Sequence, residues 1–300
     1  MTNEKVQISI VIPTIHREKS LEQTLLGLKN QKQVVFEVLV IYQSPLTHLK
    51  SEDYPVNFYF LHSNKQSASA ARNIGILNSK SEILLFIDDD VLINDDYFVY
   101  KHLRHYGNKQ LPGVVGRSKE KSINKTTYLR PKRSFNNNIG FFYSSKDYGV
   151  STFLQTGRSN NLSVRKEFAN KVGGMDENYS RGAHREETDF CLRISRQFGK
   201  FIYDPNSVVT HLNEFSGGIR SWNDSNYIKA KHHMVGAIYF GLKMAPLRYR
   251  HEYFFTTLRY LVCNKTILLR PRLYAKVIVR FISSYITAVK LVTSGPIYLN

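Results

Sequence analysis

Three consecutive carboxylates, Asp88, Asp89 and Asp90, are the residues of this chain best suited to chemistry. Adjacent acids repel one another unless a cation neutralises them, and hard oxygen ligands suit Mg²⁺ or Mn²⁺ beside substrate phosphates. They follow the apolar run Ile83–Ile87, which is typical of a strand buried on both faces of a parallel sheet. Open α/β sheets bind ligands at the carboxyl ends of their strands, so we expect a metal-assisted site here. The alternative is a solvated acidic turn or an N-cap cluster for the next helix.

The elements that would position these acids alternate between strands and helices. This β-α-β-β-α-β order predicts an α/β fold with a mostly parallel sheet and helices on both faces. We expect Ser20 to cap the first helix, with Gln23 completing a capping box. The predicted strands cover residues 6–12, 36–41, 57–61, 83–87 and 114–115, and the predicted helices cover 20–30, 67–77 and 94–106.

The second half of the chain is less regular. Residues 118–148 are polar, basic and rich in Asn and Ser, which predicts a long loop over the site. After residue 226 the pattern becomes helical, basic and aromatic, so we expect a main domain at 1–220 and a helical C-terminal extension at 221–300. Between these segments we expect helices at 164–172 and 186–198 and short strands at 201–203 and 208–212.

The composition indicates a folded and strongly basic protein. The chain has 300 residues, 42% of them hydrophobic, and a formal charge of +18. That is enough apolar material for one large α/β domain or two smaller ones. Residues 220–300 hold thirteen Lys or Arg against two Asp or Glu, a local charge of +11. This excess predicts nucleic acid, anionic lipid or a phosphorylated substrate as partner, unless it is only a soluble basic surface.

Two cysteines far apart, Cys191 and Cys263, argue against a disulfide framework and fit a reducing compartment. The N-terminus enters a predicted strand without an apolar signal region. Charged residues interrupt the apolar stretches near the C-terminus, so we expect none to reach the ~20 apolar residues that a membrane-spanning helix needs. The interrupting residues are Lys265, Arg270, Lys276, Arg280 and Lys290.

Six short motifs occur in an order and at spacings that resemble the inverting family 2 glycosyltransferases of the GT-A fold. The resemblance covers about residues 6–215. Each motif is weak alone, but six in order are specific. The resemblance implies a GT-A sheet and a nucleoside-diphosphate sugar as donor. The motifs are Val11-Ile12-Pro13-Thr14, Ala71-Arg72-Asn73-Ile74-Gly75, Ile87-Asp88-Asp89-Asp90, Gly173-Gly174-Met175-Asp176-Glu177, Arg185-Glu186-Glu187-Thr188-Asp189, and Tyr203-Asp204-Pro205 followed by His211.

The resemblance implies a bound Mn²⁺ or Mg²⁺. In such a reaction negative charge grows on the departing diphosphate, and a metal ion neutralises it. In the family the last acid of the motif touches the metal and an earlier one contacts ribose or sugar, which corresponds to Asp90 and Asp88 here. His211 matches a late histidine that some relatives use as a metal ligand, although a histidine after a strand is as often structural.

The donor nucleotide is expected near the ends of the first two strands and the second helix. Relatives often place an Asp at the end of the second strand to pair with uracil. Tyr42 stands at that place here, so we expect Tyr42 to stack on the base and Gln43 to hydrogen-bond it. Arg72 would contact the nucleotide or its phosphates, or else be a surface charge. The expected donor-binding residues are Pro13, Thr14, Tyr42, Gln43, Arg72, Asp88 and Asp89.

The acceptor hydroxyl needs a base on the opposite face of the sugar, as in an inverting glycosidase. The family's Glu-Asp pair matches Glu186-Glu187, which implies that Glu187 is the base. Both acids also suit the first turn of a helix for its stability alone. Trp222 would stack on a sugar face or simply pack. The expected acceptor-binding residues are Asn160, Asn161, Glu186, Asp189 and Trp222.

The basic, aromatic C-terminal extension favours lying in an anionic membrane interface without spanning it. A helical subdomain packed on the core or on a second protomer, and hence a homo-oligomer, fits equally. We therefore expect a cytoplasmic enzyme, peripheral on the inner face of the membrane. It would move a hexosyl or deoxyhexosyl group to a glycan or lipid-linked acceptor in polysaccharide biosynthesis.

Two other functions are weighed against this one. A sugar-nucleotide pyrophosphorylase would need a Gly-rich, basic phosphate loop after the first strand, and this sequence has none there. A membrane- or nucleic-acid-binding module with a degenerate sugar site would explain the charge. A binder, however, has no need of the acids Asp88, Asp89, Asp90 and Glu187, so we do not expect a nucleic-acid partner.

Overall fold

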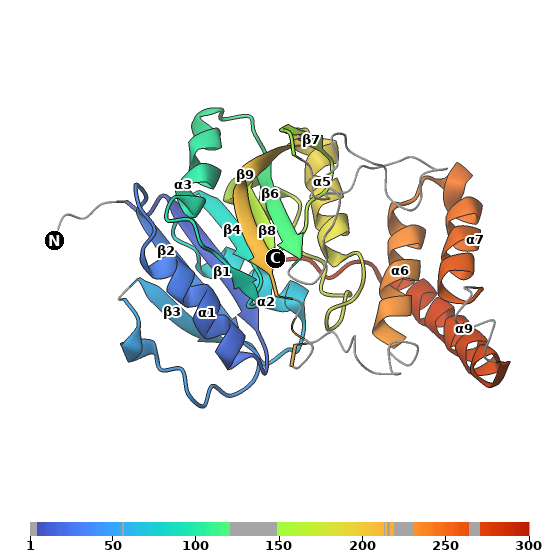
Figure 1. Ribbon diagram of the computed structural model, residues 1–300. Coiled ribbons are helices and arrows are strands. Elements are labelled where there is room, and N and C mark those ends of the chain that lie inside the picture. The colour runs from blue at the N-terminus through green and yellow to red at the C-terminus, as the bar shows by residue number, and fades with distance from the viewer. Residues whose placement is uncertain are drawn as a thin grey trace.

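The computed structural model describes residues 5–55, 57–120, 149–212, 214, 217–218, 231–263 and 271–299. A central nine-stranded sheet is flanked by helices, and a group of C-terminal helices lies to one side, beyond α5 (Figure 1). The predicted α/β class with helices at the C-terminus is confirmed. The predicted boundary at residue 220 lies outside the described residues, and so do residues 121–148 of the predicted loop.

The first half of the sheet is parallel, as predicted. Strand β1 (Ile8–Thr14) pairs with β2 (Phe36–Tyr42) on one side and β4 (Ile83–Ile87) on the other, and β2 pairs with β3 (Phe58–His62). These strands are mostly apolar, and β1 and β4 are buried along their whole length. Because the strands are parallel, Thr14, Tyr42 and the acidic motif emerge at the same edge of the sheet.

The second half of the sheet is mixed. Strand β8 (Asn161–Arg165) is antiparallel to β4 and to β6 (Gly113–Glu120), and β9 (Phe201–His211) is parallel to β6 and antiparallel to β5 (Val91–Leu92). The strand order is β3-β2-β1-β4-β8-β6-β9-β5, and β7 (Thr152–Leu154) pairs with β9. The acidic motif connects β4, which lies beside β1, to β5, which pairs with β9.

Two predictions for this half were wrong. Val164 lies in β8 and pairs with Leu84, so the predicted helix at 164–172 begins only at Lys166. The two short strands predicted at 201–203 and 208–212 form the single strand β9, since a register shift after Gly116 of β6 absorbs the irregular residues between them. This continuous strand carries His211 to the edge where β4 ends.

The helices follow the predicted amphipathic patterns more closely than the predicted ends. Helix α1 begins at Glu18 rather than Ser20, and Ser20 is buried inside it, so the capping box was wrong. The helix predicted at 94–106 is shorter. The helices of the main domain are α1 (Glu18–Lys29), α2 (Ala68–Asn78), α3 (Phe98–Leu103), α4 (Lys166–Lys171) and α5 (Glu186–Phe198), with 3₁₀ turns at Ser51–Asp53 and Arg104–Gly107.

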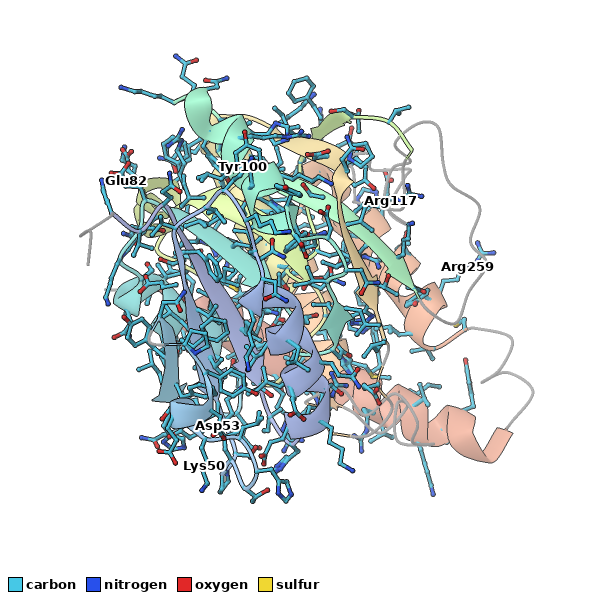
Figure 2. All side chains as sticks on the ribbon, turned by 60° about the vertical axis from the view of Figure 1, so that its left-hand side comes forward. Lys50, Asp53, Glu82, Tyr100, Arg117 and Arg259 are labelled. Carbon is cyan, nitrogen blue, oxygen red and sulfur yellow. The ribbon has the colours of Figure 1, made fainter. Side chains whose placement is uncertain are left out.

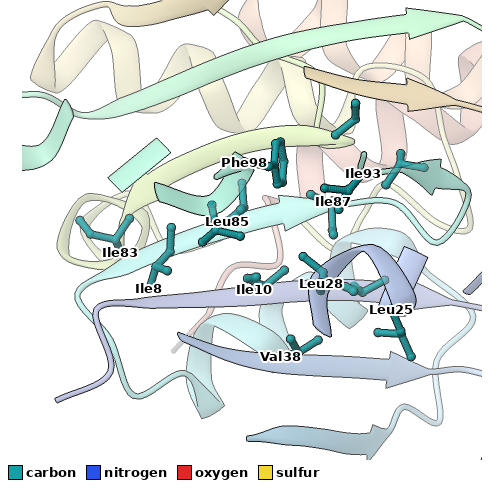
Figure 3. Packing of buried hydrophobic residues seen from close by; sticks show 14 of the residues in the cluster. Ile8, Ile10, Leu25, Leu28, Val38, Ile83, Leu85, Ile87, Ile93 and Phe98 are labelled. Atoms are coloured by element: carbon teal, nitrogen blue, oxygen red, sulfur yellow. The ribbon is translucent and has the colours of Figure 1, made fainter. Parts of the chain in front are cut away.

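Two apolar cores lie on the two faces of the sheet. One lies between the sheet and helices α1 and α3, where Ile10, Leu25 and Phe98 are fully buried (Figure 3). The other lies under α2, α4 and α5 and contains Phe86 and Phe190, whose rings meet edge to face at 6.1 Å. The buried stripe predicted for α5 holds for Phe190 and Ile194, while Phe198 is only partly buried.

The C-terminal helices form a third core together with Tyr179, Ala183 and Leu192 of the main domain. These helices are α6 (Lys231–Met244), α7 (Arg250–Leu261), preceded by a 3₁₀ turn at Leu247–Tyr249, and α9 (Pro271–Ser294). After α9 the chain returns to the sheet, and the Leu299 amide donates to the Gly173 carbonyl oxygen at 2.8 Å. Gly173 and Gly174 have positive φ, and a Cβ on either would collide with Tyr298 or Leu299.

Helix α9 corrects one expectation about membranes. Its segment Tyr274–Ser294 is long and apolar enough to cross a membrane, judged by length and composition alone. About a fifth of that segment, 22%, is buried inside the protein. Core helices pass the same test, so the segment is weak evidence for a span.

Candidate functional site

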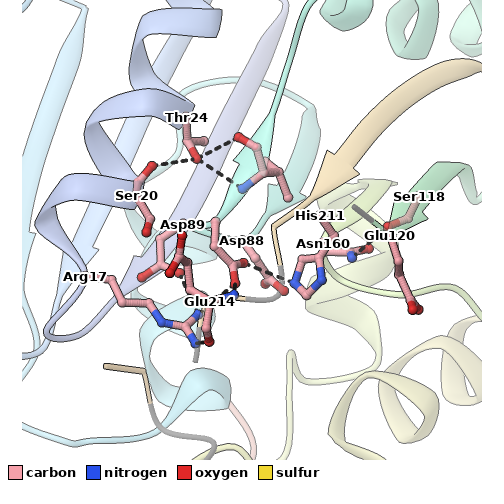
Figure 4. A network of polar contacts seen from close by, with 12 residues as sticks. Arg17, Ser20, Thr24, Asp88, Asp89, Ser118, Glu120, Asn160, His211 and Glu214 are labelled. Atoms are coloured by element: carbon pink, nitrogen blue, oxygen red, sulfur yellow. Dashed lines mark hydrogen bonds and ion pairs between the residues drawn. The ribbon is translucent and has the colours of Figure 1, made fainter. Parts of the chain in front are cut away.

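The acidic motif lies where β1, β4 and β9 end (Figure 4). The backbone turns directly after Ile87, and the Leu212 amide donates to the Asp90 carbonyl oxygen at 2.8 Å. This hydrogen bond ties the motif to the end of β9, which carries His211. Residues far apart in the sequence are thereby held at one point by the sheet itself.

Asp88, Asp90 and His211 form a group that would fit a metal ion. Each offers one ligand atom, and these atoms all lie within 4.8 Å of one another. His211 Nε2 is 3.1 Å from Asp90 Oδ1. Burial raises the pKa of Asp90, but the hydrogen bond and charge of His211 and the charge of Arg17 outweigh it, so its pKa is lowered. A charged Asp90 beside an imidazole and a second carboxylate is a donor set that suits Mn²⁺ or Mg²⁺ with its own waters.

Asp89 points away from this group, towards β1. It accepts a hydrogen bond from Thr14 Oγ1 at 2.7 Å, and Arg17 Nη1 lies 3.3 Å from its Oδ1 and 3.0 Å from Asp90 Oδ2. Burial raises the pKa of Asp89 to about 7, against the lowering effect of the Arg17 charge. Arg17 also donates to the Glu214 carbonyl oxygen at 2.9 Å, so its guanidinium closes this side of the motif.

Arg72 joins the acidic motif to helix α5. Its Nη2 lies 2.9 Å from Asp88 Oδ1 and its Nη1 lies 3.1 Å from Glu186 Oε1, and the side chain is 3% exposed. Ser69 also donates to Glu186, at 3.3 Å. Arg72 and Glu186 are thus paired with each other and buried, which fits a role in positioning Asp88 better than a role on the surface. The predicted contact of Arg72 with the donor and that of Glu186 with the acceptor both stay predictions.

Glu187 faces a cavity, whereas Glu186 faces the interior. The cavity is about 490 Å³ and is lined by Glu187, Asp88 and His211 together. Among the described residues, no hydrogen bond or ion pair engages the Glu187 carboxylate. The residue before the pair, Arg185, has a positive φ of 79° and stands at the N-terminus of α5. Successive side chains of a helix point about 100° apart, so one of the two adjacent acids faces the core and the other faces the cavity.

The other predicted donor residues lie at the same edge of the sheet. Pro13 and Thr14 are buried at the end of β1, and Tyr42 is half-buried with its ring 5.1 Å from that of His62. The Gln43 side-chain oxygen Oε1 accepts from the Ser67 backbone amide at 2.7 Å, just before α2, so this oxygen is already engaged.

The predicted acceptor residues are separated by the fold. Asn160 lines the cavity, but Asn161 is buried with its amide bonded to the Arg117 and Ser207 carbonyl oxygens. Asp189 is fully buried in a network away from the cavity lining. Trp222 lies outside the described residues. Of this set with described positions, Asn160 alone lines the cavity.

Sequence reasoning missed two groups that touch the site. Arg17 lies three residues after Thr14, so its nearness to the first motif was a signal for it. Helices α6 and α7 also line the cavity, through Ala237, Thr257, Tyr260 and Leu261. No motif marks these residues, because packing of distant helices places them there.

Comparison with known proteins agrees with this geometry. The family model described as "Glycosyl transferase family 2" matches residues 9–165. An uncharacterised glycosyltransferase of Haemophilus influenzae is 24% identical over 68% of this chain and 67% of its own length. The poly(ribitol-phosphate) beta-N-acetylglucosaminyltransferase TarP of Staphylococcus aureus is 27% identical over 36% of this chain and 35% of its own. This chain therefore spans about a third of the length of TarP.

Two solved structures show the same fold. The mannosyltransferase PcManGT of Pyrobaculum calidifontis, in complex with GDP-Man and Mn²⁺, has a TM-score of 0.56 at 13% identity, over 98% of this chain and 80% of that one. S. aureus TarS has a TM-score of 0.55 at 14% identity, over 94% of this chain and 55% of that one. The expected GT-A fold is thereby confirmed. The family model covers more than half of the chain, and the protein belongs to glycosyl transferase family 2.

Proposed function

We propose that the protein is a metal-dependent, inverting glycosyltransferase that moves a sugar from a nucleoside diphosphate to a glycan or lipid-linked acceptor. One observation carries the proposal. Asp88, His211 and Glu187 line a single cavity at the carboxyl edge of the sheet. This shared lining supports a metal group and a base that act on one bound sugar.

Asp88, Asp90 and His211 would hold the metal ion. When bound, Mn²⁺ or Mg²⁺ neutralises the charge that develops on the leaving diphosphate. Arg72 holds Asp88 from behind at 2.9 Å, so that carboxylate is oriented before the donor arrives. Arg17 lies 3.3 Å from Asp89 Oδ1 and 3.0 Å from Asp90 Oδ2, so its positive charge offsets part of the repulsion among the three acids.

Glu187 would accept the proton of the acceptor hydroxyl. As that proton leaves, the acceptor oxygen forms a bond to the anomeric carbon, and the bond from that carbon to the diphosphate oxygen breaks. Attack from the face opposite the leaving group inverts the configuration at this carbon. Tyr42, Gln43 and Thr14, at the ends of β1 and β2, would contact the nucleotide base and ribose. The sugar transferred would be a hexosyl or a deoxyhexosyl group.

Thermal unfolding with nucleoside diphosphates tests the donor site. The purified protein would be heated with UDP, GDP, CDP and dTDP, each with and without Mn²⁺. We expect one nucleotide to stabilise the fold only with metal, by about 2.7 kcal/mol at 100 times its dissociation constant. The proposal is abandoned if no nucleotide shifts the unfolding temperature and no nucleotide sugar is consumed.

A second part of the proposal places the enzyme on the inner face of an anionic membrane. The outer side of α9 exposes Val279, Ile282 and Ile286 by 67%, 53% and 52%, between Lys276 and Lys290. Arg259 of α7 projects from the ribbon of the C-terminal helices (Figure 2). An apolar strip beside cations fits an interfacial helix. Flotation with phosphatidylglycerol vesicles should recover the protein, whereas phosphatidylcholine vesicles should not, and equal recovery would count against an anionic surface.

A further inference from the structure

The cavity that contains Glu187 is shared between the main domain and the C-terminal helices. Asn160 and Glu187 line it from the main domain, and Thr257, Tyr260 and Leu261 of α7 line it from the other side. We infer that α7 supplies the second wall of the acceptor subsite and that this subsite takes a ring sugar of a glycan. The inference rests on the proposed function and specifies its acceptor.

Two buried polar atoms in this lining have no hydrogen-bond partner among the described residues. They are Asn160 Oδ1 and Thr257 Oγ1, and their residues are 5% and 2% exposed. The Asn160 amide nitrogen donates to Ser118 Oγ at 3.0 Å, which fixes the orientation of the amide. Its oxygen then has no donor among the described residues. A buried polar group without a partner costs about 1–3 kcal/mol. Both atoms are buried behind the cavity surface, so a ligand that pairs them recovers that energy once the two side chains turn toward it.

The chemistry of the two atoms indicates a polyhydroxylated ligand. An amide oxygen only accepts, whereas a threonine hydroxyl both donates and accepts. A sugar hydroxyl also does both, so one hydroxyl donates to Asn160 and another exchanges a hydrogen bond with Thr257. The two atoms belong to different parts of the fold, so a ligand that pairs them spans the cavity from wall to wall.

The aromatic and apolar residues of the same wall favour a ring. Tyr260 is 55% exposed at the cavity, while Leu261 and Ala237 are each 6% exposed behind it. A pyranose has a flat face of C–H groups that packs on an aromatic ring, and an open-chain polyol has no such face. These residues lie beyond the family match at residues 9–165.

Replacement of Thr257 by Val separates this role from a structural one. Valine has the same shape without the hydroxyl, and loss of an unpaired buried hydroxyl leaves a fold equally stable or more stable. We therefore expect Thr257→Val to unfold at the same or a higher temperature, yet to raise the acceptor KM by about ten-fold, the effect of roughly one lost hydrogen bond. We expect a similar rise for Tyr260→Ala. Phe255→Ala, on the same helix, is the control, since Phe255 is 62% exposed and does not line the cavity.

The assay uses the nucleotide sugar found by thermal unfolding, with p-nitrophenyl glycosides of glucose, galactose, mannose and N-acetylglucosamine as acceptors. Ribitol 5-phosphate serves as the open-chain acceptor, and products are detected by mass spectrometry. Higher acceptor KM in both variants, with unchanged nucleotide stabilisation and a normal control, supports the inference. Variants that match Phe255→Ala overturn it. Transfer to ribitol 5-phosphate alone, or to no acceptor despite metal-dependent nucleotide binding, overturns it while leaving the donor site intact. Absence of nucleotide binding overturns both the proposed function and this inference.

Discussion

Lys243 is predicted to be the residue that fastens the C-terminal helices to the main domain. Its Nζ on α6 lies 2.7 Å from Asp176 Oδ2 and 2.8 Å from Asp189 Oδ2, and both carboxylates are fully buried. Burial lowers the pKa of Lys243, but the charges of Asp189 and Asp176 outweigh it and leave the pKa raised. Lys243 is therefore protonated in the folded protein at neutral pH.

Replacement of Lys243 by Met would leave two buried carboxylates without their shared cation. Removal of one partner of a buried ion pair costs about 3–5 kcal/mol. Both acids keep other donors. The Tyr239 hydroxyl donates to Asp176 at 2.6 Å, as do the Asn178 and Ile297 amides at 3.0 and 3.1 Å, and Arg193 donates to Asp189 at 2.7 Å. We therefore expect a loss near the lower end, about 3 kcal/mol, or roughly 5–10 °C in melting temperature.

Urea unfolding of Lys243→Met measures this loss. Lys290→Met is the matched control, because Lys290 is exposed on α9 and a surface change of this kind alters stability by less than about 0.5 kcal/mol. Addition of Asp176→Asn to Lys243→Met should recover part of the loss, since it removes an uncompensated charge. A Lys243→Met protein as stable as the control would refute the reasoning that this network joins the two parts.

Three further predictions concern the site and the core. Glu187→Gln should lower transfer by at least about 100-fold, the scale of one general base, while nucleotide-dependent stabilisation is kept; loss of both would point to misfolding instead. Asp90→Asn should abolish the Mn²⁺-dependent part of that stabilisation, and an unchanged metal response would exclude Asp90 as a ligand. Burial lowers the pKa of His102 to about 4. Between pH 6.5 and 4 the His102 ring therefore stays neutral in the folded protein, whereas in the unfolded chain it gains a proton. Stability should therefore fall by roughly 1.4 kcal/mol per pH unit between pH 6.5 and 4, and His102→Gln should flatten that slope in urea unfolding.

The behaviour of His102 follows from one chain of hydrogen bonds. Its Nε2 lies 2.8 Å from Asn161 Oδ1, which only accepts, so the proton of the neutral ring sits on Nε2. Its Nδ1 lies 3.0 Å from Ser163 Oγ, whose hydroxyl donates to it and accepts from Tyr106 at 2.8 Å. Asn161, expected from the family motif to bind the acceptor, therefore holds the core between β8, β6 and β9. Its buried position has a structural cause that the motif could not reveal.

Local patterns determined the elements that carry the site. Five apolar residues followed by three acids defined β4 and the edge where it ends, because burial on both faces requires a continuous apolar strand. The spacing of Phe190 and Ile194 likewise defined the buried face of α5. Local patterns failed where pairing partners overrode them. Val164 is a strand residue because it pairs with Leu84 of β4, a contact eighty residues away in the chain.

Only the tertiary structure decided which of the two adjacent acids Glu186 and Glu187 lines the cavity. The sequence by itself placed Glu186 and Glu187 together at the start of a helix, but only the packing of that helix shows that Glu186 meets the buried Arg72 and that Glu187 lines the cavity. The wall made by Thr257 and Tyr260 has no sequence signal at all. Apolar periodicity reports which face of a helix is buried, whereas a cavity is created by the shapes of elements that meet across long stretches of chain.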